Sequence, residues 1–213
     1  MTTEELKVII SAETAKYDKA IKKVQKSATS LQKVLARTFS VAALAAFGKS
    51  CLQAASDLEE VQNVVDVAFG DMADEANKFA RDAIRSFGIT ELQAKRLSST
   101  FMAMTTSMGI GRQTAKTMSL SLTALAADMS SFYNVDLSTA QTALEGVITG
   151  NTRALRQFGV VITDATLQEY ALSKGIKKSV GGMSSAEKAA LRYNYAVHAL
   201  SLSIGDYART SNS

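Results

Sequence analysis

Cysteine and histidine are side chains often used as nucleophile, general base or soft metal ligand, and each occurs once in this sequence. Cys51 is the single cysteine and His198 the single histidine among 213 residues. One of each cannot complete a His/Cys zinc site, and a lone cysteine cannot form an internal disulfide. His198 lies on an apolar stripe of helical spacing, so we expect a packed, structural histidine rather than a catalyst.

The remaining candidates for chemistry also favour structural roles. Asp128 is a lone carboxylate on a predicted helix, and an acid–base pair needs two such groups. Gly146 and Gly150 share one helix face but lie outside any apolar span of membrane length, so they indicate close packing or a turn. Five methionines at core spacing predict ordinary packing rather than an adaptable binding surface: Met102, Met104, Met108, Met118 and Met129. With no P-loop and no G-x-S-x-G motif, we expect no enzymatic activity, no cofactor and no metal site.

The composition favours long helices. Proline and tryptophan are absent, aromatic residues make up 7%, and hydrophobic residues 46%, so nothing forces a helix to break and the core must rely on aliphatic side chains. The net charge of +4 includes no dense basic block, so specific nucleic-acid binding is not predicted. The longest apolar stretch, residues 39–55, contains Lys49 and Gln53, so we expect no membrane span there. About forty residues precede it, so we do not expect it to be a signal peptide.

The first 38 residues predict a separate arm. Residues 6–12 alternate weakly and could form one short strand, for which no pairing partner is evident. From about residue 14, apolar side chains recur at a 4-3-4-3 spacing as far as Ala45, which predicts a long N-terminal helix with lysines on its other faces. This stripe could form a coiled-coil-like seam or dock on the rest of the domain. Its candidate partner-binding residues are Tyr17, Ile21, Val24, Leu31 and Leu35.

Residues 39–213 predict a helical core domain, with roughly seven or eight helices in the chain joined by short turns. Four helices are expected to end at a glycine followed by a β-branched residue that folds back onto the helix. These glycines are Gly88, Gly109, Gly159 and Gly175. Thr90 with Gln93, and Ser184 with Glu187, are predicted capping boxes that begin two further helices. Apolar stripes place Leu58 and Phe132 in the core and extend the last helix to Ile204.

A corner is predicted near residues 139–162. A helix to Ile148 is followed by a turn, where the side-chain oxygen of Asn151 or Thr152 could cap a new short helix. Gly159 is expected to end that helix, and the chain then leaves in an extended conformation. Residues 174–182, rich in glycine and lysine, predict a flexible loop.

These residues also carry a family resemblance. The string GNTRALRQFGVVIT, with ALEG before it and ATLQEYALSKGI after it, resembles the N-terminal part of phage tail tape measure proteins. The resemblance runs from DLEEVQNVVDVAFG, which begins at Asp57, to GDYARTS, which ends at Ser211. Several separated motifs occur in the family's order, so the resemblance covers most of the chain.

The resemblance implies a structural role in tail assembly and in setting tail length. In that family a long helical chain fills the tail tube during assembly in the host cytoplasm, and it is released from the virion tail so that DNA can pass. The implied partners are tail assembly chaperones, the tail tube protein and other tape measure copies. Family members are usually several times longer, so this chain is expected to be a fragment or an early-terminated copy. The alternative is a helical interaction module, a scaffold or a secreted protein, that binds partner helices through residues 17–45.

Overall fold

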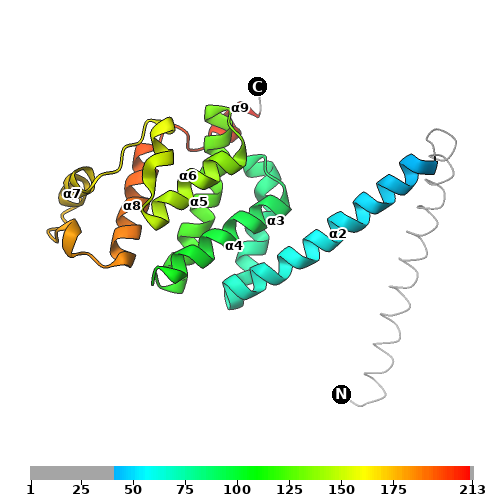
Figure 1. The fold of residues 1–213 in the computed structure, drawn as a ribbon, viewed down its shortest axis with the longest axis horizontal. Helices are drawn as coiled ribbons and strands as arrows, with labels where there is room; N and C mark the ends of the chain where they lie inside the picture. The colour runs from blue at the N-terminus through cyan, green and yellow to red at the C-terminus, as the bar shows by residue number, and fades with distance from the viewer. Residues whose placement is uncertain (1–40, 212–213) are drawn as a thin grey trace, which may run out of the picture. The chain divides into compact units, whose positions relative to one another are not determined.

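The computed structural model describes residues 41–211 and, within residues 41–56, the side chains of Lys49, Gln53 and Ser56 alone. The described part is helical and contains no strand, which confirms the predicted all-α class (Figure 1). The possible strand at residues 6–12, the arm and its boundary after Thr38 lie outside the described residues. The elements are α2 (Val41–Phe69), η1 (Gly70–Met72), α3 (Ala73–Phe87), α4 (Glu91–Ser107), α5 (Arg112–Tyr133), α6 (Leu137–Thr149), η2 (Thr152–Phe158), α7 (Asp164–Ser173), η3 (Val180–Gly182), α8 (Ser185–Ala199) and α9 (Asp206–Thr210).

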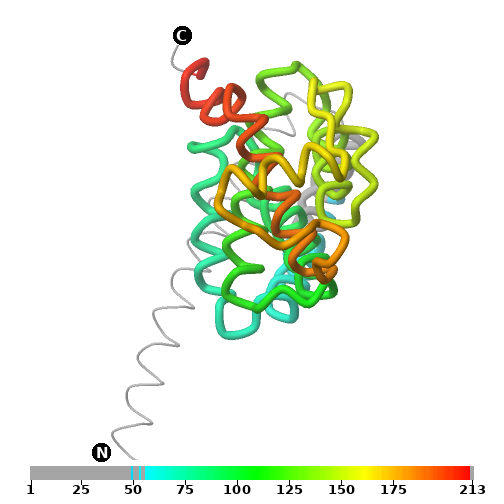
Figure 2. Tube along the Cα trace, turned by 90° about the vertical axis from the view of Figure 1, so that its left-hand side faces the viewer, coloured from blue at the N-terminus to red at the C-terminus, as the bar shows by residue number. Residues whose placement is uncertain are grey.

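The chain divides into two units, Met1–Ser56 and Asp57–Ser213. The second unit is built around α5, which packs against α3, α4, α6 and α9 (Figure 2). Half of the residues of α5 are buried, on more than one face, as expected for a helix enclosed by neighbours. Its buried hydroxyls are satisfied locally, because Ser119 donates to the Lys116 carbonyl and Thr123 to the Ser119 carbonyl, both at 2.8 Å. These two hydroxyls are therefore paired within α5, whereas the Ser99 hydroxyl and one Asp128 carboxylate oxygen are buried without a hydrogen-bond partner.

The glycine stops form as predicted. All four glycines have positive φ, between 71° and 83°, and the residues after three of them donate back across the turn to the carbonyl five residues earlier. The β-branched residue is buried after the first three stops, at Ile89, Ile110 and Val160. Ile176, after the fourth stop, is 40% exposed.

Both predicted capping boxes are present, and the structure adds a third. The Thr90 and Ser184 hydroxyls accept the backbone N–H groups of Gln93 and Glu187, at 3.2 Å each. Thr163 and Thr166 form the same reciprocal pair at the start of α7. Sequence reasoning missed this pair because the residue at the third position is threonine instead of Glu or Gln.

Several predictions of burial and extent are wrong. Leu58 and Phe132 are 40% and 42% exposed; the Phe132 ring, one residue before the end of α5, packs edge-to-face on Tyr133 at 4.9 Å. The last predicted helix stops at Ala199 instead of reaching Ile204, which is 43% exposed. The chain turns there because the Asp128 carboxylate binds the Gly205 N–H group at 2.7 Å, and the short helix α9 follows.

The corner between α6 and η2 requires glycine for close approach. A Cβ atom at Gly146 would collide with the Asn151 carbonyl oxygen, because the chain turns back over α6 at Gly150, where φ is +92°. The Gly150 N–H group donates to the Gly146 carbonyl at 2.8 Å and closes the turn. The predicted short helix is η2, a 3-10 helix. Neither predicted side-chain cap forms: Asn151 makes no capping bond, and the Thr152 hydroxyl donates to the Ile162 carbonyl instead.

We expect Gly146→Ala to lower the free energy of unfolding by about 1–3 kcal/mol, because the new methyl group meets a backbone oxygen that cannot rotate away. Gly181→Ala is the matched control, since its Cβ meets no atom within 4 Å and its φ is not positive. Urea unfolding followed by circular dichroism measures both variants. Equal stability of the two variants would show that the corner tolerates a side chain.

Candidate functional site

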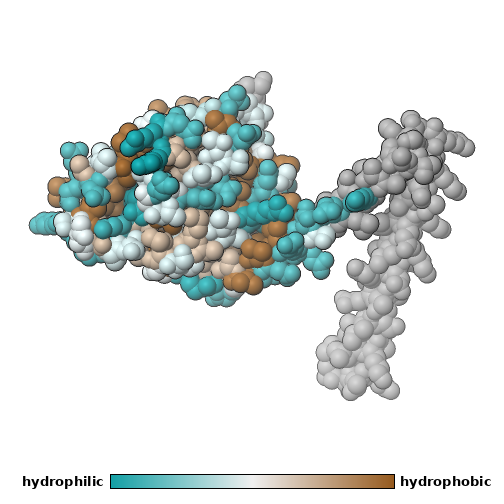
Figure 3. Space-filling model, in the orientation of Figure 1, coloured by the Kyte–Doolittle hydropathy of each residue, from teal (hydrophilic) through white to brown (hydrophobic). Residues whose placement is uncertain are grey.

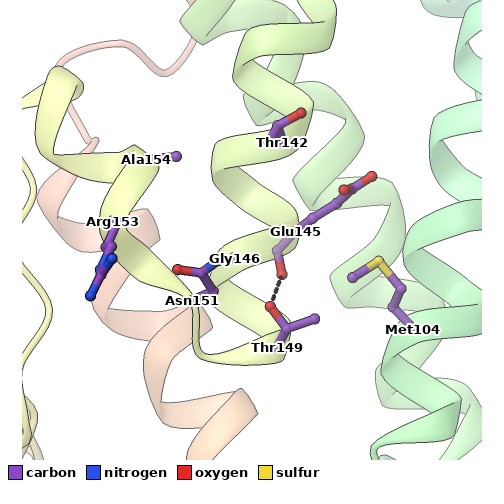
Figure 4. Close-up of a pocket in the computed structure, with 8 residues that line it drawn as sticks. All are labelled: Met104, Thr142, Glu145, Gly146, Thr149, Asn151, Arg153 and Ala154. Carbon is purple, nitrogen blue, oxygen red and sulfur yellow. Dashed lines mark hydrogen bonds between the residues drawn. The ribbon is translucent and has the colours of Figure 1, made fainter.

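The corner encloses a shallow hollow with a volume of about 370 Å³. Met104 contributes from α4 and Glu145 from α6, while Arg153 comes from η2 (Figure 4). The other lining residues are Thr142, Gly146, Thr149, Asn151 and Ala154. Most of the lining residues belong to or adjoin the strings ALEG and GNTRALRQFG, so the hollow lies at the corner that the sequence predicted without any chemistry.

The polar groups of the hollow do not converge. The Glu145 side chain extends toward Met104 and α4, whereas Arg153 points away from it (Figure 4). The Gln141 amide donates to Glu145 Oε1 at 2.8 Å, and the Thr149 hydroxyl donates to the Glu145 carbonyl at 3.1 Å. A nucleophile with an adjacent base, as acyl transfer would need, is not among these lining residues.

A half-buried arginine holds the far side of the same corner. Arg192 of α8 donates from Nε to the Val147 carbonyl and from Nη2 to the Ile148 carbonyl, both at 2.7 Å. These carbonyls belong to the last turn of α6, where backbone groups lack helical partners and the helix dipole attracts a cation. Burial lowers the pKa of the Arg192 guanidinium, and the nearby Asp164 carboxylate opposes that shift. Arg192 therefore joins α8 to the end of α6.

A second polar centre lies at Asp128, in the last two turns of α5. Asp128 is 3% exposed; one of its carboxylate oxygens accepts from the Gly205 N–H group, and the other has no hydrogen-bond partner. Beside it, Asp206 accepts from the Ser131 hydroxyl at 2.8 Å. Burial is the largest cause that raises the pKa of Asp128, and the Asp206 charge adds to it, while bonds from the Gly205 and Tyr207 backbone lower it. Asp128 thus anchors α9 instead of standing alone on its helix.

The other candidates have mixed outcomes. His198 is exposed and lies 5.6 Å from the Tyr170 ring, so the prediction of a packed core histidine is wrong. Leu191, two turns earlier on the same stripe, is buried, so the stripe is covered at its beginning and open to solvent at His198. Met102, Met118 and Met129 are buried, and Met104 and Met108 pack against the same core, as predicted. The candidate partner-binding residues lie outside the described part of the chain: Tyr17, Ile21, Val24, Leu31 and Leu35.

No sequence signal identified the roles of Arg192 and Asp128. Their partners lie 45 and 77 residues away along the chain. An arginine within an amphipathic helix and an aspartate near the end of another are both ordinary surface patterns, so only their contacts reveal them.

Replacing the half-buried Arg192 guanidinium should loosen the corner. We expect Arg192→Met to lower the free energy of unfolding by about 1–3 kcal/mol, because two carbonyls lose a charged donor. Arg153→Met, at an exposed arginine on the rim of the hollow, should change it by less than about 0.5 kcal/mol. Chemical denaturation of both variants measures the difference. Similar losses in the two variants would exclude a special role for Arg192.

Asp128 should make stability depend on pH. A raised pKa means that the folded state holds its proton more tightly than the unfolded state, so ionisation destabilises the fold as pH rises above about 4. Asp128→Asn cannot ionise and keeps an oxygen for the Gly205 N–H group. The variant should therefore gain stability relative to the parent between pH 4 and 7, measured by urea unfolding, whereas Asp82→Asn at an exposed position should not. A difference between parent and Asp128→Asn that stays constant with pH would contradict this assignment.

Metal-ligand clusters and membrane-spanning helices are both absent from the described part of the chain. The chain matches no protein-family model, no curated protein and no solved structure.

Proposed function

We propose that this chain is a structural protein of a phage tail or a tail-like particle, corresponding to the N-terminal region of a tape measure protein. The observation that supports the proposal most directly is where the family-like residues lie. The strings ALEG, GNTRALRQFGVVIT and ATLQEYALSKGI form one continuous structure, α6–η2–α7 with the connections between them. The resemblance thus falls on a defined architectural element.

The family-like strings include several residues that stabilise the fold of this element. Gly146 admits the Asn151 carbonyl, and Leu155 and Phe158 are buried beneath η2. Val160 closes the glycine stop, and Leu167 is buried in α7. These residues keep the element folded. A role in which other proteins recognise this domain requires such a folded element. The proposed partners are tail assembly chaperones, the tail tube protein and further copies of the chain.

Length control gives a direct test in the phage or prophage that encodes this chain. An in-frame insertion of about 36 helix-forming residues at exposed Gln53 adds ten turns, so it preserves which faces of α2 look outward. Tails should lengthen by about 54 Å at 1.5 Å per residue, measured by electron microscopy of purified particles. Gln53→Ala, which adds no length, should leave the tails unchanged.

Two results would decide against the proposal. If particles that contain the lengthened protein have tails of unchanged length, the protein does not determine tail length. Absence of the protein from purified tails, together with binding to another protein that is lost on Ile21→Asp and Val24→Asp, would favour the alternative of a helical interaction module.

A further inference from the structure

The fourth glycine stop leaves an apolar side chain in solvent. The Ile176 N–H group donates to the Ala171 carbonyl at 2.9 Å, so the turn that ends α7 has the same form as those after α4 and η2. The residues at the equivalent position of those turns, Ile110 and Val160, are 8% and 3% exposed, whereas Ile176 is 40% exposed. Leu172, in the last turn of α7, is 56% exposed. This turn therefore presents two apolar side chains to solvent.

The segment that follows Leu172 is basic, although exposed Glu169 lies one turn before Leu172. Residues 172–186 contain three charged residues, Lys174, Lys177 and Lys178, and all are positive. The segment is held in place, because the Val180 N–H group donates to the Gln168 side chain at 2.9 Å and Val180 is buried. Lys178 also binds Glu187 at 2.8 Å. We call Leu172, Ile176 and these lysines the α7 end.

A second apolar surface lies on α2 and has the opposite charge. Glu60, Val64 and Val67 follow a spacing of four and three residues, which places them on one helix face, away from buried Val61 and Val65. Val64 is 49% exposed and Val67 is 84% exposed, the highest value among the large apolar residues described. Residues 57–75 contain seven acidic residues and no basic one. We call Glu60, Val64, Val67 and Asp71 the α2 face.

The two surfaces lie at opposite ends of the second unit. The segment between α7 and α8 is at one end in Figure 1 and nearest the viewer in Figure 2, while η1 and the last turns of α2 lie at the other end. Apolar residues come to the surface among polar ones at both ends (Figure 3). We propose that the α7 end of one copy of this chain binds the α2 face of a second copy.

Charge determines which surfaces pair. Two α2 faces or two α7 ends in contact would bring like charges together, whereas one of each places lysines beside carboxylates and buries four aliphatic side chains. The contact joins different surfaces of the two copies, so it leaves one of each surface free and allows further copies to add in a row. The apolar area is small, so we expect a dissociation constant in the micromolar to millimolar range. The proposal does not depend on a function in phage tails.

Two variants disable one surface each. Val67→Lys places a positive charge on the α2 face, and Leu172→Glu with Ile176→Glu places negative charges on the α7 end. All three positions are exposed, so the fold should persist, which circular dichroism verifies. Ile84→Lys, on α3 and 57% exposed, is the matched control outside both surfaces. Each disabling variant should weaken self-association about tenfold or more, and the control should not.

Sedimentation velocity measures self-association of the full chain at about 50 mM and 500 mM salt. The parent should form species that grow with concentration and shrink at high salt, and each disabled variant should be monomeric. An equimolar mixture of the two disabled variants should form a dimer and nothing larger, because it contains one intact pair of surfaces.

Three outcomes would overturn the proposal. A parent that stays monomeric to about 1 mM would leave these surfaces to other partners. Disabled variants that associate as the parent does would assign self-association to another part of the chain. If neither variant self-associates alone and their equimolar mixture also stays monomeric, contact between the α7 end and the α2 face is excluded.

Discussion

The end of α6 is the constraint on which the described fold depends most. At Gly150 the chain reverses and passes so close to Gly146 that no side-chain carbon fits between them. The carbonyls of Val147 and Ile148, exposed by the end of the helix, accept two hydrogen bonds from Arg192. Because α6 packs against α4, α5, α8 and η2, this one helix end sets the positions of most of its neighbours.

The same physical principle recurs elsewhere: charged side chains bind the ends of helices. Arg112 donates to the Phe69 carbonyl at 2.8 Å, at the end of α2. The Asp128 carboxylate accepts a hydrogen bond from the Gly205 N–H group, just before α9. The Tyr207 ring of α9 lies over Gly88, and a side chain at residue 88 would collide with this ring. A helix end leaves backbone groups without partners, so a charged side chain placed there is stabilised without an opposite side-chain charge. Arg192 is held in this way, half-buried at the end of α6. At Asp128 the effect of burial is larger than that of the backbone N–H groups, so its pKa is raised.

The surface complements this core. The family-like strings form the corner, and the hollow beside it holds polar groups that do not converge on any reacting atom. Some of the exposed apolar residues, Val64 and Val67 on α2 and Leu172 and Ile176 at the end of α7, lie where the sequence is rich in charge of one sign. Such surfaces are suited to contacts with other polypeptide chains, which agrees with the structural function proposed from the resemblance.

The sequence alone determined the structural features that depend on residues within about six positions along the chain. The capping boxes at Thr90 and Ser184 and the stops at Gly109 and Gly159 formed as predicted, because their donors and acceptors are close along the chain. The helical class followed from periodicity and the absence of proline. Only the tertiary structure decided which faces are covered: Phe132 and Ile176 are exposed although local patterns favoured their burial. His198 faces outward, and Arg192 and Asp128 found partners 45 and 77 residues away. Helical periodicity identifies an apolar stripe but not the element that packs on it, since burial depends on how distant helices meet.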